Sequence, residues 1–404
     1  RNGQLNAITA HDKTRMDWRF VLVLIFSGHI YVSCFQSFPF VSDFVNSIGL
    51  RKGNFQAVSR RKLACGASSV LLNSVINDIL SRKRAEIESM KSNLPIEVSE
   101  IIKKIGSLKS KDVVMKAIKK QKGTLSVITQ IKKKTPVVES ICSSIDPELI
   151  GSQHYEAGAA AIAVCTDRHA FGFDFDTLKC IVKGQETYRS HFPGPLPVIA
   201  YDFFIDPIQI CQAAACGAAA VCLNARVLID PGSTHGLAAM LSAASGLGLE
   251  ALVEVHNTDE AAAAVAAGAK LIGVSNRDMD TWQLATPVDG LTHLLQRPLP
   301  ETVFGLVSML PGNVTAVAMG GVNETLVAWS LRDAGYSAVV VGEAVIRASE
   351  SRMAGSAYQA AYNEGKGLIR AFRSKGSVRF GPACSAAFYG KGEGAKETLG
   401  SISI

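Results

Sequence analysis

The sequence predicts an α/β fold of the (β/α)8 class, a TIM barrel in which eight parallel strands alternate with helices. Eight short apolar runs follow one another after residue 124, and stretches that suit helices separate them. Gly-Ala or Gly-Tyr turns stand just before four of the runs and are typical of helix ends. Near-continuous apolar runs that alternate with helices indicate parallel strands covered on both faces, and eight repeats favour a closed barrel. An open doubly wound sheet is the alternative, but no G-x-G-x-x-G follows the first run.

The elements can be bounded from the hydrophobic pattern. The predicted strands cover 125–131, 160–165, 197–202, 219–223, 251–255, 270–275, 314–319 and 338–342. The predicted helices between them include 206–215, 236–245, 258–267 and 323–334, and a last helix covers 355–373.

The first 69 residues differ in composition from the rest. They hold nine of the 42 basic residues and three of the 35 acidic ones, so the folded part is close to neutral. Met16 opens a basic and then apolar stretch that is typical of a signal peptide, with cleavage expected after Cys34. A Ser-bearing, basic stretch from Phe35 follows. Such two-part leaders resemble those of plastids of red-algal origin, so we expect residues 1–69 to be removed and the protein to reach the plastid stroma. Ordinary secretion is the alternative.

The remaining chain is expected to have three parts. Residues 70–124 form a helical extension, with one helix over 73–94 that ends before Pro95 and a basic connector after it. Residues 125–373 form the barrel, and residues 374–404 form a polar, Gly-rich tail with too little apolar content for a core. We expect this tail to lie on the barrel or to bind a protein partner.

Several kinds of ligand are not expected. The charge of the folded part is nearly balanced, so nucleic acid is not an expected partner, and the mature chain is not expected at a membrane. The nine Cys form no C-x-x-C pair and no Cys/His cluster, so neither a metal nor a cofactor is expected.

Polar residues stand at the ends of two neighbouring predicted strands. Glu254 closes the fifth strand, and Asn276, Arg277 and Asp278 follow the sixth. The carboxyl ends of barrel strands meet at one mouth, where barrel enzymes hold their active sites. We therefore expect a site at this mouth.

The same regions resemble one family. The stretch "PVIAYDFFIDPIQI" is similar to "PVLRKDFIIDPYQI" of indole-3-glycerol-phosphate synthases, and "VITQIKKKTP" is similar to their first-strand "VIAEIKRKSP". "EALVEVHNTDE", "IGVSNRDM", "VAMGGV" and "VVVGEAVIRA" resemble their fifth to eighth strands, and the match spans about residues 75–365. The resemblance implies a barrel that closes an indole ring on a carboxyphenylamino deoxyribulose phosphate, with loss of CO₂ and water.

The resemblance also implies roles for individual residues. The catalytic positions fall on Lys132, Glu254 (the general base) and Tyr201, which stands where the family has its general-acid lysine. The positions implied for substrate binding are Gln130, Thr135, Phe171, Ser275 and Arg277. The positions implied for the phosphate are Gly320, Gly321, Gly342 and Glu343.

Several positions depart from the family. Besides Tyr201, Gln130 replaces a glutamate, Ser275 an asparagine, and Met319-Gly320 a Glu-Ser pair. Phe173 and Asp174 replace a Gly-Ser pair of the second loop. We therefore expect a barrel that retains a pocket for a small phosphorylated ligand but has lost, or strongly reduced, the ring-closing reaction. The alternatives are an active synthase that uses Lys132 and Glu254, and a barrel enzyme acting on another phosphorylated substrate.

Overall fold

The computed structural model describes residues 22–26, 29–33, 74–104, 112–118, 124–142, 145–285, 303–349 and 356–373. The chain divides into two units, Arg1–Val70 and Leu71–Ile404. In the first unit, β1 (Leu22–Phe26) and β2 (His29–Ser33) form an antiparallel pair. The rest of the predicted leader and the predicted tail, 374–404, lie outside the described residues.

The second unit contains a closed barrel of eight parallel strands, in the order β10-β3-β4-β5-β6-β7-β8-β9, which confirms the predicted fold class. Each strand pairs with its neighbour along the chain, and β10 closes the ring on β3. The strands are β3 (Ser126–Ile131), β4 (Ala161–Cys165), β5 (Val198–Tyr201), β6 (Ala220–Asn224), β7 (Glu250–Val255), β8 (Leu271–Ser275), β9 (Thr315–Met319) and β10 (Ala338–Val341).

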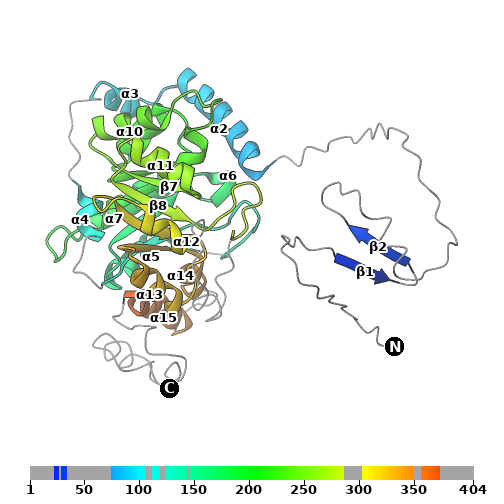
Figure 1. The fold of residues 1–404 in the computed structure, drawn as a ribbon. Coiled ribbons are helices and arrows are strands. Elements are labelled where there is room, and N and C mark those ends of the chain that lie inside the picture. Colours follow the sequence, from blue (N-terminus) through cyan, green and yellow to red (C-terminus); the bar gives the residue numbers. More distant parts are fainter. Residues whose placement is uncertain are drawn as a thin grey trace, which may run out of the picture. The chain divides into compact units, whose positions relative to one another are not determined.

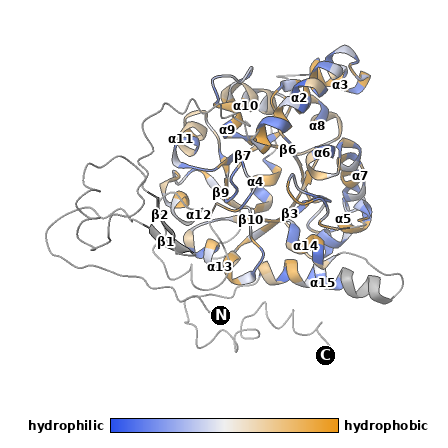
Figure 2. Ribbon diagram, turned by 90° about the vertical axis from the view of Figure 1, so that its right-hand side faces the viewer, coloured by the Kyte–Doolittle hydropathy of each residue, from blue (hydrophilic) through white to orange (hydrophobic). Residues whose placement is uncertain are grey.

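Helices surround the strands (Figure 1). They are α5 (Pro147–Glu156), α6 (Arg168–Phe171), α7 (Phe175–Glu186), α8 (Pro207–Ala215), α9 (Ala225–Leu228), α10 (Leu237–Gly246), α11 (Thr258–Ala266), α12 (Val303–Leu306), α13 (Thr325–Ala334), α14 (Glu343–Ala348) and α15 (Ser356–Arg373). Within single outer helices, hydrophobic and hydrophilic residues alternate (Figure 2), as expected where one face packs on the barrel and the other meets solvent.

Glycines close helices ahead of the strands, as predicted. Gly158, Gly217, Gly268 and Gly335 all have positive φ, and Gly335 at φ 117° is the C-cap of α13. This backbone region is disfavoured for residues with a Cβ, so glycine ends the helix there without steric cost.

Alternate residues along a strand face opposite sides and pack into two separate cores. In β3, Ile128 belongs to a cluster that fills the barrel with residues such as Ile199 and Leu252. Val127 and Ile131 belong to a cluster that includes the residues of the covering helices. The period of two therefore decides which residues of each strand reach the barrel interior.

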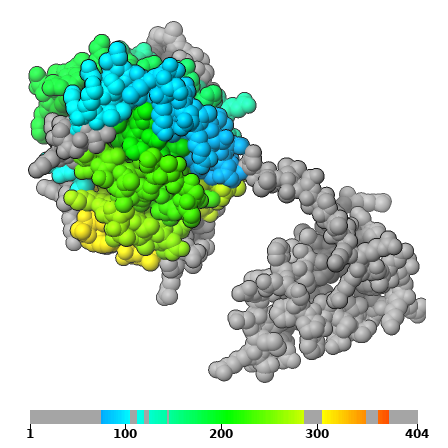
Figure 3. Space-filling view, turned by 90° about the horizontal axis from the view of Figure 1, so that it is seen from above, coloured from blue at the N-terminus to red at the C-terminus, as the bar shows by residue number. Residues whose placement is uncertain are grey.

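The amino-terminal extension has three described helices, α2 (Val75–Ser92), α3 (Ile96–Ile102) and α4 (Val113–Ile118). Pro95 separates α2 from α3, and α3 packs against α8. Residues of α2 and α3 form a continuous blue-to-cyan band along one side of the second unit (Figure 3). The Glu250 carboxylate, at the start of β7, accepts hydrogen bonds from the Val114 and Met115 backbone N–H groups at 2.6 and 2.9 Å. One side chain of the barrel thus holds the first turn of α4.

In the part of the chain that the structure describes, none of the helices combines the length and the apolar character that a membrane crossing requires.

Candidate functional site

A pocket lies at the carboxyl ends of the strands, where the sequence predicted the site. Eleven of the twelve residues predicted for the site line it, together with Trp282, Met319, Val322, Asn323 and Val340. The eleven come from segments between residue 130 and residue 343. The pocket encloses about 40 Å³, because side chains of the barrel mouth fill most of it.

Thr135 is the predicted residue that does not line the pocket. It is buried, and its hydroxyl accepts a hydrogen bond from the Val138 backbone N–H at 3.0 Å. Its backbone also pairs with Val138 in an isolated bridge. These contacts place Thr135 in the turn after β3.

Lys132 and Gln130 extend the inward-facing row of β3, as the alternation predicted. Both are 7% exposed, and Lys132 Nζ donates to Gln130 Oε1 at 2.7 Å. Burial and the nearby Arg277 guanidinium lower the pKa of Lys132. Lys133 faces the other way, with its ammonium 4.8 Å from the centre of the Phe173 ring.

Tyr201 and Glu254 form a direct pair across the pocket. The Tyr201 hydroxyl donates to Glu254 Oε2 at 2.8 Å, and both side chains are buried. Burial and the adjacent carboxylate raise the pKa of Tyr201 well above its usual value. Burial alone would raise the pKa of Glu254, but contacts with His256, Tyr201 and Ser275 hold it below its usual value. The pair is therefore a neutral phenol that donates to a carboxylate anion.

His256 also contacts Glu254, a contact that the sequence analysis did not anticipate. Its Nε2 lies 3.5 Å from Glu254 Oε1, and its Nδ1 lies 2.8 Å from Glu260 Oε2. A signal for this was present in the sequence, since His256 directly follows β7 and stands two residues after Glu254, and residues two apart in extended chain face the same side.

Arg277 and Trp282 also line the pocket. Arg277 Nη1 donates to the Trp282 carbonyl at 2.8 Å, and Asp278 accepts from the Thr281 backbone N–H at 2.7 Å. Trp282 has a φ of 61°, a rare conformation for a bulky residue, and packs against Phe171 and Phe203. Its indole N–H is buried without a hydrogen-bond partner among the described residues.

Glycines line the wall formed by β9 and β10. Gly320 has a φ of 80°, and a Cβ there would lie 3.2 Å from the Asn276 backbone nitrogen. Gly321 has a φ of 76°, and a Cβ on Gly342 would lie 3.1 Å from Gln130 Oε1. Glu343 follows as the first residue of α14, and its carboxylate pairs with Arg347 at 2.8 Å.

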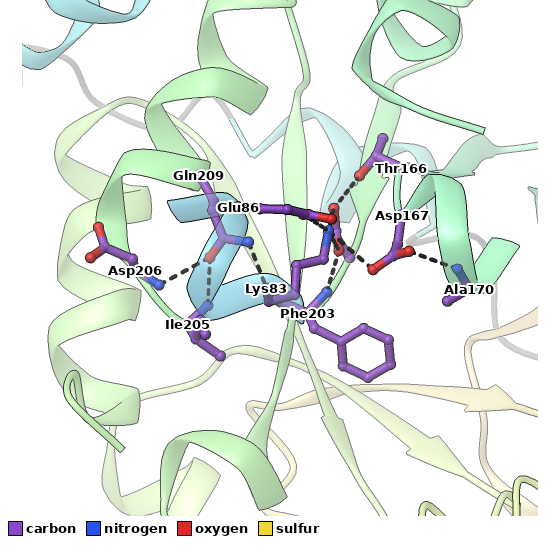
Figure 4. A network of polar contacts seen from close by, with 10 residues as sticks. Lys83, Glu86, Thr166, Asp167, Ala170, Phe203, Ile205, Asp206 and Gln209 are labelled. Atoms are coloured by element: carbon purple, nitrogen blue, oxygen red, sulfur yellow. Dashed lines mark hydrogen bonds and ion pairs between the residues drawn. The ribbon is translucent and has the colours of Figure 1, made fainter. Parts of the chain in front are cut away.

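A buried ion cluster joins α2 to the barrel mouth beside this pocket (Figure 4). Lys83 is 3% exposed, and its Nζ lies 3.1 Å from Asp167 Oδ2 and 3.0 Å from Asp202 Oδ1. Thr166 Oγ1 and the Phe203 backbone N–H donate to Asp202 at 2.9 and 2.7 Å. Lys83 was not among the predicted site residues, although it lies on the buried stripe of α2 with Ile76, Ile79 and Ile87.

Within the described ranges, no group of three or more His, Cys, Asp and Glu side chains is arranged to hold a metal ion.

Comparison with known proteins agrees with this architecture. Residues 76–356 match the family model described as indole-3-glycerol phosphate synthase. An indole-3-glycerol phosphate synthase of Roseiflexus castenholzii is 33% identical over 281 residues, which cover 69% of this chain and 96% of that protein. The protein of the same name from Chlorobium phaeovibrioides is 31% identical over 279 residues, with coverage of 69% and 96%. The match spans most of the chain and almost the full length of these relatives, so the chain belongs to the indole-3-glycerol phosphate synthase family.

Proposed function

We propose that this family member binds a small phosphorylated ligand at the barrel mouth and that its ring-closing activity is lost or strongly reduced. It would then act as a structural or regulatory protein. The observation that carries the proposal is the hydrogen bond from the Tyr201 hydroxyl to Glu254 at 2.8 Å. The positions that the resemblance assigns to the general acid and the general base contact each other.

The chemistry of this pair supports the loss of activity. A general acid works best when its pKa lies near the working pH, and a well-placed one contributes typically about 10²–10⁴-fold. The pKa of Tyr201 is raised well above its usual value, so the phenol holds its proton tightly. Glu254, in turn, already accepts from Tyr201 and faces His256.

The size of the pocket supports the same conclusion. Pockets for small molecules usually enclose roughly 300–1,000 Å³. About 40 Å³ is free here, which is room for a few water molecules. Met319 helps to fill the space, since a Cβ on Gly273 would lie 2.3 Å from its sulfur atom. A ligand of the family's size would require movement of these side chains.

Charges and backbone geometry favour an anionic ligand. Lys132 and Arg277 bring two basic groups to the pocket, and Gly320, Gly321 and Gly342 allow the backbone to approach a ligand closely. Glu343 opposes an anion, but its pairing with Arg347 offsets its charge. A phosphate group would lie between the glycines of β9 and β10 and the Lys132 ammonium.

One observation favours the alternative of an active synthase. Lys132 lies in the pocket, and burial lowers its pKa, which makes its ammonium a better proton donor near neutral pH than an exposed lysine. Lys132 as the acid and Glu254 as the base would then replace the family's usual pair. The same two residues would also serve a barrel enzyme acting on a different phosphorylated substrate.

A fluorescence assay for indole-glycerol phosphate, with the carboxyphenylamino deoxyribulose phosphate as substrate, separates these possibilities. Wild type and Glu254→Gln are compared at equal concentration. We expect no turnover from either protein, together with saturable binding of inorganic phosphate that Lys132→Met weakens about tenfold or more. Turnover by wild type that disappears in Glu254→Gln would establish the active alternative and overturn the proposal.

A further inference from the structure

His256 lies between two carboxylates. Its Nδ1 is 2.8 Å from Glu260 Oε2, and its Nε2 is 3.5 Å from Glu254 Oε1. The side chain is 11% exposed, so solvent contributes little to its hydrogen bonding. Nδ1 is thus in hydrogen-bond contact with Glu260, whereas Nε2 is buried, forms no hydrogen bond among the described residues and faces the Glu254 carboxylate.

The Glu260 carboxylate is fixed by hydrogen bonds from neighbouring residues. Its Oε2 accepts the His256 backbone N–H at 2.7 Å, and its Oε1 accepts from Asn257 Nδ2 at 2.8 Å. Asn257 is the N-cap of α11, so this carboxylate belongs to the first turn of that helix. Glu254, in contrast, belongs to β7 and lines the pocket.

The two carboxylates define the protonation state of the imidazole. A neutral imidazole has one N–H donor and one lone pair, whereas an imidazolium has two donors. A neutral ring would place its lone pair against one of two buried carboxylates. An imidazolium donates to Glu260 and turns its second N–H toward Glu254 at ion-pair distance, and it leaves the cluster of His256, Glu254 and Glu260 with one net negative charge.

We propose that His256 is a positioning residue of the candidate site: as an imidazolium anchored on Glu260, it keeps Glu254 ionised and turned toward Tyr201 and the pocket. The proposal rests on the proposed function only in taking this pocket as the ligand site. Glu254 also contacts Tyr201 of β5 and Ser275 of β8, and the titratable groups near its carboxylate further include Lys132, Cys165 and Cys222.

The electrostatics agree with the geometry. Burial by itself would lower the pKa of His256, but its contacts with Glu254 and Glu260 outweigh burial and raise the pKa to about 9. The same contact helps to hold the pKa of Glu254 below its usual value. The positive charge of His256, which does not line the pocket, thus stabilises the negative charge of Glu254, which does.

The test is NMR of the full chain without any ligand. Long-range ¹H–¹⁵N spectra distinguish an imidazolium from either neutral tautomer, and ¹³C spectra of the Glu carboxyl carbons follow Glu254. In wild type we expect His256 to remain an imidazolium up to about pH 9. In His256→Gln we expect the titration midpoint of Glu254 to rise by at least one pH unit. His169→Gln is the matched control, since His169 is an exposed histidine and its loss is expected to leave Glu254 unchanged.

Two results would overturn the proposal. The first is a neutral His256 ring in wild type at pH 7.5, which needs no variant and so holds even if a substituted protein does not fold. The second is an unchanged Glu254 midpoint in a folded His256→Gln protein. Glu260→Gln gives an independent check, because removal of its charge should lower the His256 midpoint below 9 toward the ordinary value of about 6.5.

Failure of this inference and failure of the proposed function are distinguishable. The titrations concern the unliganded protein and do not depend on what the pocket binds. Titration with inorganic phosphate, followed by the fluorescence of Trp282 in the pocket wall, tests the ligand site separately. Normal titrations without phosphate binding would overturn only the ligand assignment.

Discussion

The Tyr201 hydroxyl donates a hydrogen bond to Glu254 Oε2 at 2.8 Å, and this contact joins β5 to β7 across the pocket. Fifty-three residues separate the two positions in the chain. A lysine at position 201 would bring an ammonium group to the reacting atoms, whereas the phenol is held on the carboxylate. The proposed loss of ring-closing activity rests on this contact.

Replacement of Tyr201 by phenylalanine tests the strength of this contact. A hydrogen bond to a charged group contributes about 1.5–3 kcal/mol, and the buried Glu254 would lose a donor. We expect Tyr201→Phe to lower the free energy of unfolding by about that amount, measured by urea denaturation at pH 7. Tyr155→Phe removes an exposed hydroxyl that donates to the Phe192 carbonyl at 3.2 Å, so it is expected to cost less than about 1 kcal/mol.

A double substitution tests whether the family activity can be recovered. Tyr201→Lys with Met319→Glu restores two residue types that the resemblance assigns to the family site. A general acid contributes typically about 10²–10⁴-fold, so we expect the double variant to show measurable ring-closing turnover where wild type shows none. The fluorescence assay for indole-glycerol phosphate measures the gain. No gain from a folded double variant would show that these two substitutions alone do not explain the lost activity, and it would favour a pocket that serves another ligand.

Lys83 is expected to contribute strongly to stability. Its ammonium contacts the buried carboxylates of Asp167 and Asp202, which would be left uncompensated in Lys83→Met. Removal of one partner from a buried ion pair costs about 3–5 kcal/mol. We expect a loss of this size in the free energy of unfolding. Arg84→Met, at the exposed neighbouring position, is the control and is expected to change stability by less than about 0.5 kcal/mol. Equal losses in both variants would exclude a special role for the cluster.

The raised pKa of His256 predicts that the folded protein loses stability at alkaline pH. Its pKa is about 9 in the folded protein and about 6.5 in the unfolded chain, so the folded state binds the proton more tightly. This contribution is complete below pH 6.5 and disappears as the pH rises through 9. It amounts to about 3 kcal/mol. Unfolding measured between pH 6 and 10 should show the decline, and the decline should be smaller in His256→Gln. A parallel profile for the two proteins would contradict the contribution.

The lowered pKa of His154 predicts that the folded protein loses stability at acid pH. The side chain is fully buried on α5, neither ring nitrogen has a hydrogen-bond partner among the described residues, and burial lowers its pKa to about 3. The unfolded chain therefore binds a proton that the folded protein excludes. Stability should fall by about 1.4 kcal/mol for each pH unit below 6.5. In His154→Leu we expect a shallower slope, measured by chemical denaturation between pH 4 and 7.

Much of the fold could be predicted from the sequence because its signals are local. The strands are mostly apolar, as in 251–255 where Glu254 is the one polar residue, and the structure differs from the prediction by one or two residues at most. The positive φ of Gly335 follows from a helix that has to end before β10. The row of Ile128, Gln130 and Lys132 follows from the period of two within one strand. The extension was less predictable, since the contact of α4 with Glu250 joins residues 136 positions apart.

The sequence by itself determined the barrel, its strand order and the place of the pocket at the carboxyl ends, because backbone periodicity and apolar burial operate within each repeat. Only the tertiary structure decided which charges meet there. Tyr201 reaches Glu254, His256 faces both Glu254 and Glu260, and Lys83 enters between Asp167 and Asp202. These contacts depend on how far each side chain extends into a shared, water-poor space. Burial then makes each pairing matter, because an unpaired charge there is costly.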